Sequence, residues 1–176
     1  MRIVRRIVLG VAAIAAVASA PTSGALASPR SHGATLSQLE SSVLADINAF
    51  RTQHGLATLR LNSQLTTAAR AHTQQMAQKG YFAHESADGS VFWKRLHRFY
   101  ASAHSWSVGE NLLWSSPGID GAQALKLWLA SPEHRKNLVN PRWREIGVSA
   151  VHAAQAPGVY HGLDVTIVTT DFGVRR

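Results

Sequence analysis

Residues 124–151 read ALKLWLASPEHRKNLVNPRWREIGVSAV, and this stretch contains both a helix pattern and a strand pattern. Its first part repeats apolar residues at helical spacing behind Asp120, whose side chain suits a helix N-cap. Ser131-Pro132 ends that helix, because the residue before a proline is driven out of the helical conformation. From 146 to 151 the alternation of side chains predicts a strand. The stretch therefore passes from helix to strand within one short segment.

Upstream of this stretch the sequence predicts two long helices. The first carries an apolar stripe from Leu36 to Phe50, with Thr35 as its N-cap and Gly55 as its stop. The second begins near Asn62 and is ended by Gly80. Its apolar stripe consists of Leu65, Ala69, His72 and Met76. Both helices are expected to bury one face against the rest of the domain.

The remaining residues predict one more helix, a loop and further strands. Residues 91–100 predict a short third helix, and residues 102–116 read as a polar loop interrupted by aromatic residues. Residues 159–172, rich in Val, Ile and Thr, predict one or two strands after a turn at Pro157-Gly158. Helices thus come early and strands late, which favours an α+β domain with an antiparallel sheet over repeated βαβ units.

The composition excludes several classes of protein. The chain has 176 residues, 45% of them hydrophobic and 16% charged, which is typical of one globular domain. Cysteine is absent, so disulfide scaffolds, thiolate metal sites and a cysteine nucleophile are excluded. The motifs GxSxG, SxxK, GxGxxG and GxxxxGK[ST] do not occur. The formal charge of +8 comes from scattered side chains, so we expect no nucleic-acid partner and at most an attraction to anionic envelope polymers.

The N-terminus has the order of a secretory signal peptide. Three arginines in the first six residues precede an uncharged apolar run over 7–20, and Ala25-Leu26-Ala27 offers a cleavage site. The run is shorter than the ~20 residues that span a bilayer, so we expect no stable membrane insertion after cleavage. We therefore predict a signal peptide over 1–27, a disordered leader over 28–34, and a secreted domain over 35–176. The chain left after cleavage, residues 28–176, would have a net charge of +5, from 15 basic and 10 acidic residues.

The candidate chemical groups are histidines and carboxylates. His84 in YFAH and His134 in SPEHR lie at expected loops or element ends, as do Glu110 in VGEN and Glu133 beside His134. Two neutral imidazoles with a carboxylate or water would suit Zn²⁺. However, 50 positions separate the two histidines and no HExxH motif occurs, so spacing alone gives a metal site little support.

The same residues also have purely structural interpretations. Glu110 could hold its loop by accepting backbone hydrogen bonds, and Glu133 could be an exposed partner of Arg135 or Lys136. His72 lies on an apolar stripe, so it is expected to be a hydrogen-bonded core histidine. The remaining histidines are expected at the surface: His54, His97, His104, His152 and His161.

Five collinear segments, covering roughly residues 36–173, resemble the CAP superfamily, also called the SCP domain. They are LADINAFRTQHGLATLRLNSQL, AARAHTQQMAQKGYFAHESADG, VGENLLW, ALKLWLASPEHRKNLVNPRWREIGVSAV and TTDFG. The combination of YFxH, GEN and WxxSPxHRxNLxNPxxxxIGV is highly specific, whereas GEN alone is not. The superfamily contains cysteine-rich secretory, antigen 5 and pathogenesis-related 1 proteins. This chain is most similar to its cysteine-free, secreted bacterial branch.

The resemblance implies a three-layer α-β-α sandwich with a central antiparallel sheet. It also implies a cleft lined by two histidines and two acids, of which His84, Glu110 and His134 match this sequence position by position. In the eukaryotic pattern the second acid lies three residues after the helix tryptophan, where this chain has Ser131 after Trp128. Glu133 is the candidate to replace it. The family implies a divalent cation, commonly zinc, held by His84 and His134.

Three functions remain open at this point. The first is a secreted, monomeric binding module that takes a cation and an unidentified extracellular or envelope ligand. The second is lipid or sterol binding, in an apolar groove lined by Trp93, Trp106 and Trp114. The third is a metal-dependent hydrolase of peptide or cell-wall material, with Glu110 or Glu133 as the base. The bacterial branch shares no single activity, so fold alone does not decide among them.

Overall fold

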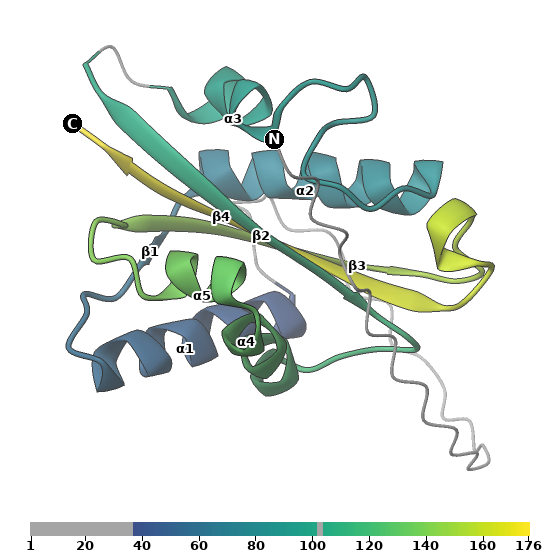
Figure 1. Cartoon of the computed structure of the whole chain (residues 1–176), viewed down its shortest axis with the longest axis horizontal. Coiled ribbons are helices and arrows are strands. Elements are labelled where there is room, and N and C mark those ends of the chain that lie inside the picture. The colour runs from purple at the N-terminus through teal and green to yellow at the C-terminus, as the bar shows by residue number, and fades with distance from the viewer. Residues whose placement is uncertain (1–36, 102–103) are drawn as a thin grey trace, which may run out of the picture.

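A four-stranded sheet lies between two layers of helices in the computed structural model of this chain (Figure 1). The structure describes residues 37–101 and 104–176, so the predicted signal peptide and leader lie outside the described residues. One face is covered by α2 (Ser63–Lys79) and α3 (Phe92–Tyr100). The other is covered by α1 (Gln38–Gln53), α4 (Gly121–Ala130) and α5 (Pro132–Leu138). The predicted three-layer sandwich is confirmed.

The sheet has the strand order β1-β3-β4-β2, which makes β2 an edge strand. Its strands are β1 (Arg60–Leu61), β2 (Trp106–Ser115), β3 (Glu145–Ala153) and β4 (Val165–Arg175). The long strands β2, β4 and β3 pair antiparallel as predicted, and only the two-residue β1 pairs in parallel, with β3. No helix among the described residues is long and apolar enough to cross a bilayer.

The structure corrects two predictions for the second half of the chain. The polar loop predicted over 102–116 is wrong for residues 106–115, which form β2 and pair with β4 along their whole length. The predicted strand from 159 starts late, since Gly158–Tyr160 is a 3-10 helix and β4 begins at Val165. Both errors arise because a strand is stabilised by its neighbours, which a local pattern does not contain.

The ends of the helices follow their capping residues. Ser37, not Thr35, is the N-cap of α1: its hydroxyl accepts from the Glu40 amide, and its own amide donates to the Glu40 carboxylate. In α2 the prediction is confirmed, with Asn62 as N-cap and Gly80 in the left-handed conformation at the end. Helix α5 was not predicted; it starts at Pro132, a residue well suited to the first helical turn.

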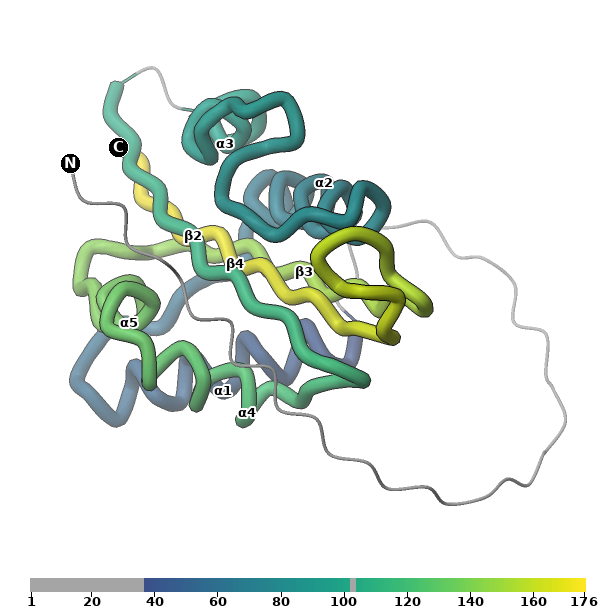
Figure 2. Tube along the Cα trace, turned by 45° about the vertical axis from the view of Figure 1, so that its right-hand side comes forward, coloured from purple at the N-terminus to yellow at the C-terminus, as the bar shows by residue number. Residues whose placement is uncertain are grey.

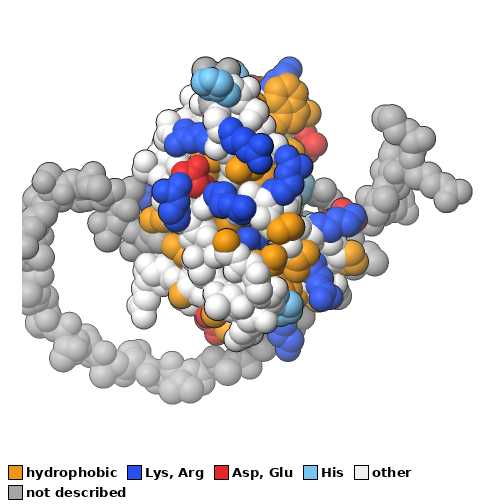
Figure 3. Space-filling view, turned by 90° about the vertical axis from the view of Figure 1, so that its left-hand side faces the viewer, with side chains coloured by type: hydrophobic (Ala, Val, Ile, Leu, Met, Phe, Trp, Pro, Cys, Tyr) orange, Lys and Arg blue, Asp and Glu red, His pale blue; other side chains and the backbone are white. Residues whose placement is uncertain are grey.

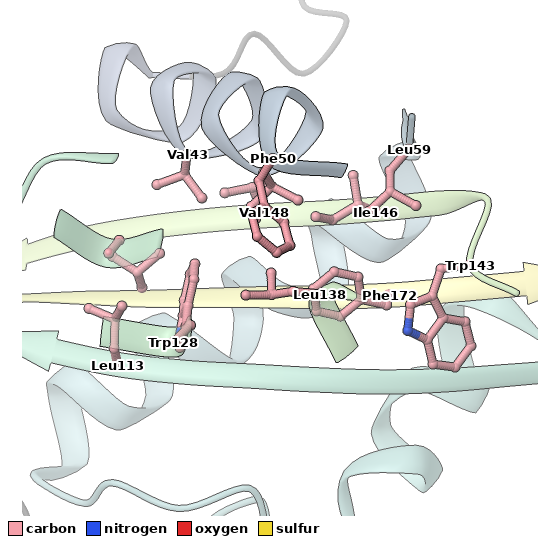
Figure 4. Packing of buried hydrophobic residues seen from close by; sticks show 13 residues of the cluster. Val43, Phe50, Leu59, Leu113, Trp128, Leu138, Trp143, Ile146, Val148 and Phe172 are labelled. Carbon is pink, nitrogen blue, oxygen red and sulfur yellow. The ribbon is translucent and has the colours of Figure 1, made fainter. Parts of the chain in front are cut away.

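The larger of the apolar clusters lies between the sheet and the α1, α4 and α5 layer. Figure 4 shows Val43 and Phe50 reaching from α1 toward Val148 of β3, with Trp128 of α4 beside Leu113 of β2. All are almost fully buried. The indole of Trp128 also donates a hydrogen bond of 3.2 Å to a β2 carbonyl, so this cluster fixes α4 against the edge strand.

On the opposite face, α2 lies unusually close to the sheet at Gly147 of β3. A Cβ at this position would overlap the backbone of Leu65 and Thr66 in α2. A side chain here would therefore push the helix outward. Gly147 is the direct neighbour of Asp171 in β4, which in turn pairs with Glu110 in β2. The close approach of α2 therefore seals the sheet beside two carboxyl groups.

Candidate functional site

The centre of the candidate site is Glu110, whose side chain is only 1% exposed. Its carboxylate accepts a 2.8 Å hydrogen bond from Nδ1 of His84 and pairs with the guanidinium of Arg95. Burial alone would raise the pKa of Glu110, but the hydrogen bond from His84 and the charge of Arg95 outweigh it and hold the pKa below its ordinary value. Glu110 is therefore ionised at neutral pH. The His84 ring, 21% exposed, lies between this buried charge and solvent.

The segment that carries His84 is held in place by two further side chains. His72 donates from Nε2 to the carbonyl of Ala83 at 2.9 Å, and Arg95 donates to the carbonyl of His84 and to Ser86, both at 3.1 Å. His72 is 1% exposed, and burial lowers its pKa to about 4, so the ring is neutral. The prediction of a hydrogen-bonded core histidine at His72 is confirmed. Its hydrogen bond fixes the residue directly before His84.

The backbone of His134 is hydrogen-bonded to a side chain of β2 on the opposite face of the sheet. Asn111 donates to the carbonyl of His134 at 3.1 Å, and Asn137 donates to the carbonyl of Glu110 at 3.1 Å and to the Asn111 side chain at 2.8 Å. Successive side chains of a strand point to opposite faces. Thus Glu110 holds the ring of His84 from the α2 side, and Asn111 holds the backbone of His134 from the α5 side.

β2 is an edge strand, so no further strand lies beyond it in the sheet. The two faces of the sheet therefore meet along the free edge of β2. Figure 2 shows α5 below β2 and the segment between α2 and α3 above it. The structure therefore attaches both histidines to consecutive residues of one strand, although they are 50 positions apart in the chain.

Glu133, the candidate second acid, lies elsewhere. Its side chain is 79% exposed and pairs with Lys136 at 3.0 Å, one turn further along α5. This is the exposed ion pair of the structural interpretation. The structure does not bring this carboxylate into the buried group around Glu110.

A different acid does belong to that group. Asp171 of β4 lies directly opposite Glu110, is fully buried, and neither of its carboxyl oxygens meets a hydrogen-bond donor among the described residues. Burial, reinforced by the negative charge of Glu110, raises its pKa well above the ordinary value. Sequence reasoning missed Asp171 and Arg95. The available signal for Asp171 was an acid inside the apolar run of the last strand.

The donor atoms fit a cation only in part. Since Nδ1 of His84 donates to a carboxylate, the lone pair is on Nε2, which is the arrangement of histidines that ligate zinc. Within residues 37–101 and 104–176, however, no group of three His, Asp or Glu side chains is placed to hold a metal. Two imidazoles are therefore the most that the predicted ligand set contains, and water or an external ligand would fill the other positions.

Of the three tryptophans considered for an apolar groove, Trp106 and Trp114 lie near opposite ends of β2. Trp93 is exposed on α3. Trp106 starts β2 and Trp114 lies near its end, where its ring packs edge-on against Tyr160 at 5.3 Å. Eight strand residues span about 27 Å. These indoles therefore do not line one small groove.

The sequence model of the cysteine-rich secretory protein family, CAP, matches residues 44–169, well over half of the chain. The chain belongs to the CAP family. Over 119 residues it is 32% identical to protein YkwD of Bacillus subtilis, which covers 68% of this chain and 45% of YkwD. Over 109 residues it is 31% identical to the membrane protein YlbC of the same organism, covering 62% and 30%. This CAP chain thus spans less than half the length of either relative.

Solved structures also share the CAP fold. An extracellular Bacillus anthracis protein with an SCP domain is 29% identical, with a TM-score of 0.60 over 78% of this chain and 40% of that one. An outer surface protein of Borrelia burgdorferi has a TM-score of 0.61 over 76% of this chain and 90% of its own, at 22% identity. At that identity the likeness shows the fold alone.

Proposed function

We propose that this CAP protein acts outside the cell as a binding module. In this proposal His84 and His134 together bind a divalent cation, and zinc is the expected ion. The observation that carries the proposal is the hydrogen bond from Nδ1 of His84 to the buried carboxylate of Glu110. An extracellular location is supported by the predicted signal peptide and by the similar extracellular protein of Bacillus anthracis.

The role of Glu110 in this proposal is to orient His84. Its negative charge keeps the proton on Nδ1 and therefore keeps the lone pair on Nε2. Arg95 donates to the other carboxylate oxygen of Glu110 and to the backbone carbonyl of His84. His84 is therefore held both through Nδ1 of its ring and through its backbone. A bound cation would offer its open coordination positions to an anionic group of an extracellular ligand.

The same geometry favours binding over hydrolysis. A general base must be free to accept a proton near neutral pH. Glu110 is already engaged by His84 and Arg95, and its pKa is lowered. Glu133 lies in solvent beside Lys136. Neither acid that the sequence suggested as a base is thus placed to activate a water molecule.

Calorimetric titration of the full chain with zinc chloride tests the proposal. We expect one zinc per chain, and we expect His84→Ala and His134→Ala each to weaken binding at least tenfold. His152→Ala is the matched control, because His152 is an exposed histidine on β3. Zinc binding that survives in the His84→Ala/His134→Ala double variant, or a wild-type chain that binds no zinc, would overturn the proposal.

A further inference from the structure

A second site lies at the end of the sheet where β2 begins and β4 ends. A cavity of about 430 Å³ opens there, lined by Trp106, Arg142, Arg144, Arg175 and Arg176 together with two serines, Ser105 and Ser107. The four arginines come from the segment before β3 and from the end of β4. Figure 3 views this end of the molecule and shows Lys and Arg side chains crowded on it.

Two of the arginines that line this cavity, Arg142 and Arg144, keep their charges available. Arg144 donates to the carbonyls of Pro141 and Trp143, at 2.6 and 2.8 Å, which orients the guanidinium without cancelling its charge. Neither Arg142 nor Arg144 forms an ion pair with a carboxylate in the described part of the chain. Two guanidinium groups are thus available to an external anion.

The carboxylate of Glu145, near these arginines, is already shared. Glu145 lies 3.6 Å from Arg175, pairs with Arg60 at 3.3 Å, and accepts a 2.5 Å hydrogen bond from Tyr100. Arg175 is further held over the Tyr100 ring, 4.6 Å from its centroid, and donates to Gln64. The negative charge of Glu145 faces several positive ones, so this end of the molecule has excess positive charge.

The other lining groups indicate what kind of molecule bears the anionic group. Trp106 is half-buried, and its indole is held against the His97 ring at a centroid distance of 5.4 Å. The Trp106 ring therefore lies on the α3 side of β2, opposite to the side to which Ser105 and Ser107 point. The hydroxyls of Ser105 and Ser107 both donate and accept hydrogen bonds, as sugar hydroxyls require. Arginine forks match phosphate and carboxylate geometry.

We propose that this cavity binds an anionic sugar, with its phosphate or carboxylate on Arg142 and Arg144 and its hydroxyls on Ser105 and Ser107. A volume of about 430 Å³ lies within the range of small-ligand sites, so one or two units of an anionic glycan are the expected occupant. The site is independent of the cation proposal, because its lining residues Ser105–Ser107 end three residues before Glu110 and it contains neither His84 nor His134.

Titration of the full chain with glucose 1-phosphate, followed by amide NMR shifts, tests this site. EDTA in every sample removes any contribution from a cation. We expect saturable shifts that include the amides of Ser105 and Ser107, and at least a tenfold loss of affinity in Arg142→Ala/Arg144→Ala. The control Lys94→Ala/Lys126→Ala removes the same charge from exposed positions on other elements and should leave the affinity unchanged.

Two further ligands separate a sugar site from a simple anion site. Ser105→Ala/Ser107→Ala should weaken glucose 1-phosphate several-fold while leaving inorganic phosphate unaffected, and a thymidine oligonucleotide should bind no better per phosphate than the sugar phosphate. Equal losses in both charge variants, inorganic phosphate that binds as well as glucose 1-phosphate, or preference for the oligonucleotide would each overturn the proposal. Circular dichroism spectra of the variants check that they are folded.

Discussion

Glu110 is the residue whose replacement should affect this domain most specifically. It is the only carboxylate that pairs with Arg95 in the described part of the chain, and Arg95 is itself only 8% exposed. The change Glu110→Gln keeps the size of the side chain and one acceptor oxygen but removes the charge. Arg95 would then be a buried cation without a counter-ion.

The expected loss follows from the burial of the pair. Two unit charges about 4 Å apart attract by about 4 kcal/mol at an effective dielectric constant near 20. Breaking a buried pair by removing one partner costs about 3–5 kcal/mol, because the other charge stays buried. Since glutamine can still accept one hydrogen bond, from His84 or from Arg95, we expect Glu110→Gln to lower the free energy of unfolding by about 3 kcal/mol.

Urea unfolding at pH 7 measures this loss, with Glu133→Gln as the matched control. The control removes the same charge from an exposed pair with Lys136 and should cost less than about 0.5 kcal/mol. In the double variant Glu110→Gln/Arg95→Met both charges are gone, so it should be less destabilised than the sum of the single variants. A Glu110→Gln chain as stable as the Glu133→Gln chain would refute the reasoning.

Three other changes test the packing around the site. Burial lowers the pKa of His72 from 6.5 to about 4, so its contribution to stability is complete above pH 6.5 and is lost as the pH falls toward 4. Between these pH values the wild type should lose about 3 kcal/mol of unfolding free energy that His72→Gln does not lose. Equal shifts of the urea midpoint in the two proteins would contradict this. Tyr100→Phe deletes a buried hydrogen bond to Glu145 and should cost about 2 kcal/mol by urea unfolding, and a loss below about 0.5 would count against it. Gly147→Ala should lower the free energy of unfolding by at least about 3 kcal/mol, measured by thermal unfolding. The control Gly118→Ala should be near neutral, because a Cβ there would make only an ordinary contact with Thr166. Similar melting temperatures for the two variants would show that α2 moves to accommodate the added methyl group.

Local signals in the sequence predicted the helices well. Asn62 and Gly80 cap α2 through their own side chain and backbone, so its ends could be read directly. Edge strand β2 was missed, because it interleaves Glu110 and Asn111 with apolar residues and depends on β4 for its hydrogen bonds. Helix α5 has four charged or titratable residues in succession, 133–136, and is held by Asn111 and Asn137 rather than by an apolar stripe.

The candidate site, like the fold, could be predicted only in part from local sequence signals. His84, Glu110 and His134 came from the family resemblance, since nothing in a spacing of 50 residues predicts that one strand holds both histidines. Arg95 stands in a run of basic residues on an amphipathic helix and looks like a solvent-facing side chain. Only the packing of α3 on β2 places it against Glu110, and that arrangement depends on tertiary structure.

Nitrogen-15 NMR of the imidazole rings, recorded with and without one equivalent of zinc, tests the account most directly. Before zinc is added, Nδ1 of His84 should carry the proton that is hydrogen-bonded to Glu110. One equivalent should then shift Nε2 of His84 and one ring nitrogen of His134 together, while His72 and His152 stay unchanged. A zinc-induced shift of His84 without His134, or His84 protonated on Nε2, would contradict the claim that Glu110 orients one of two imidazoles for a shared cation.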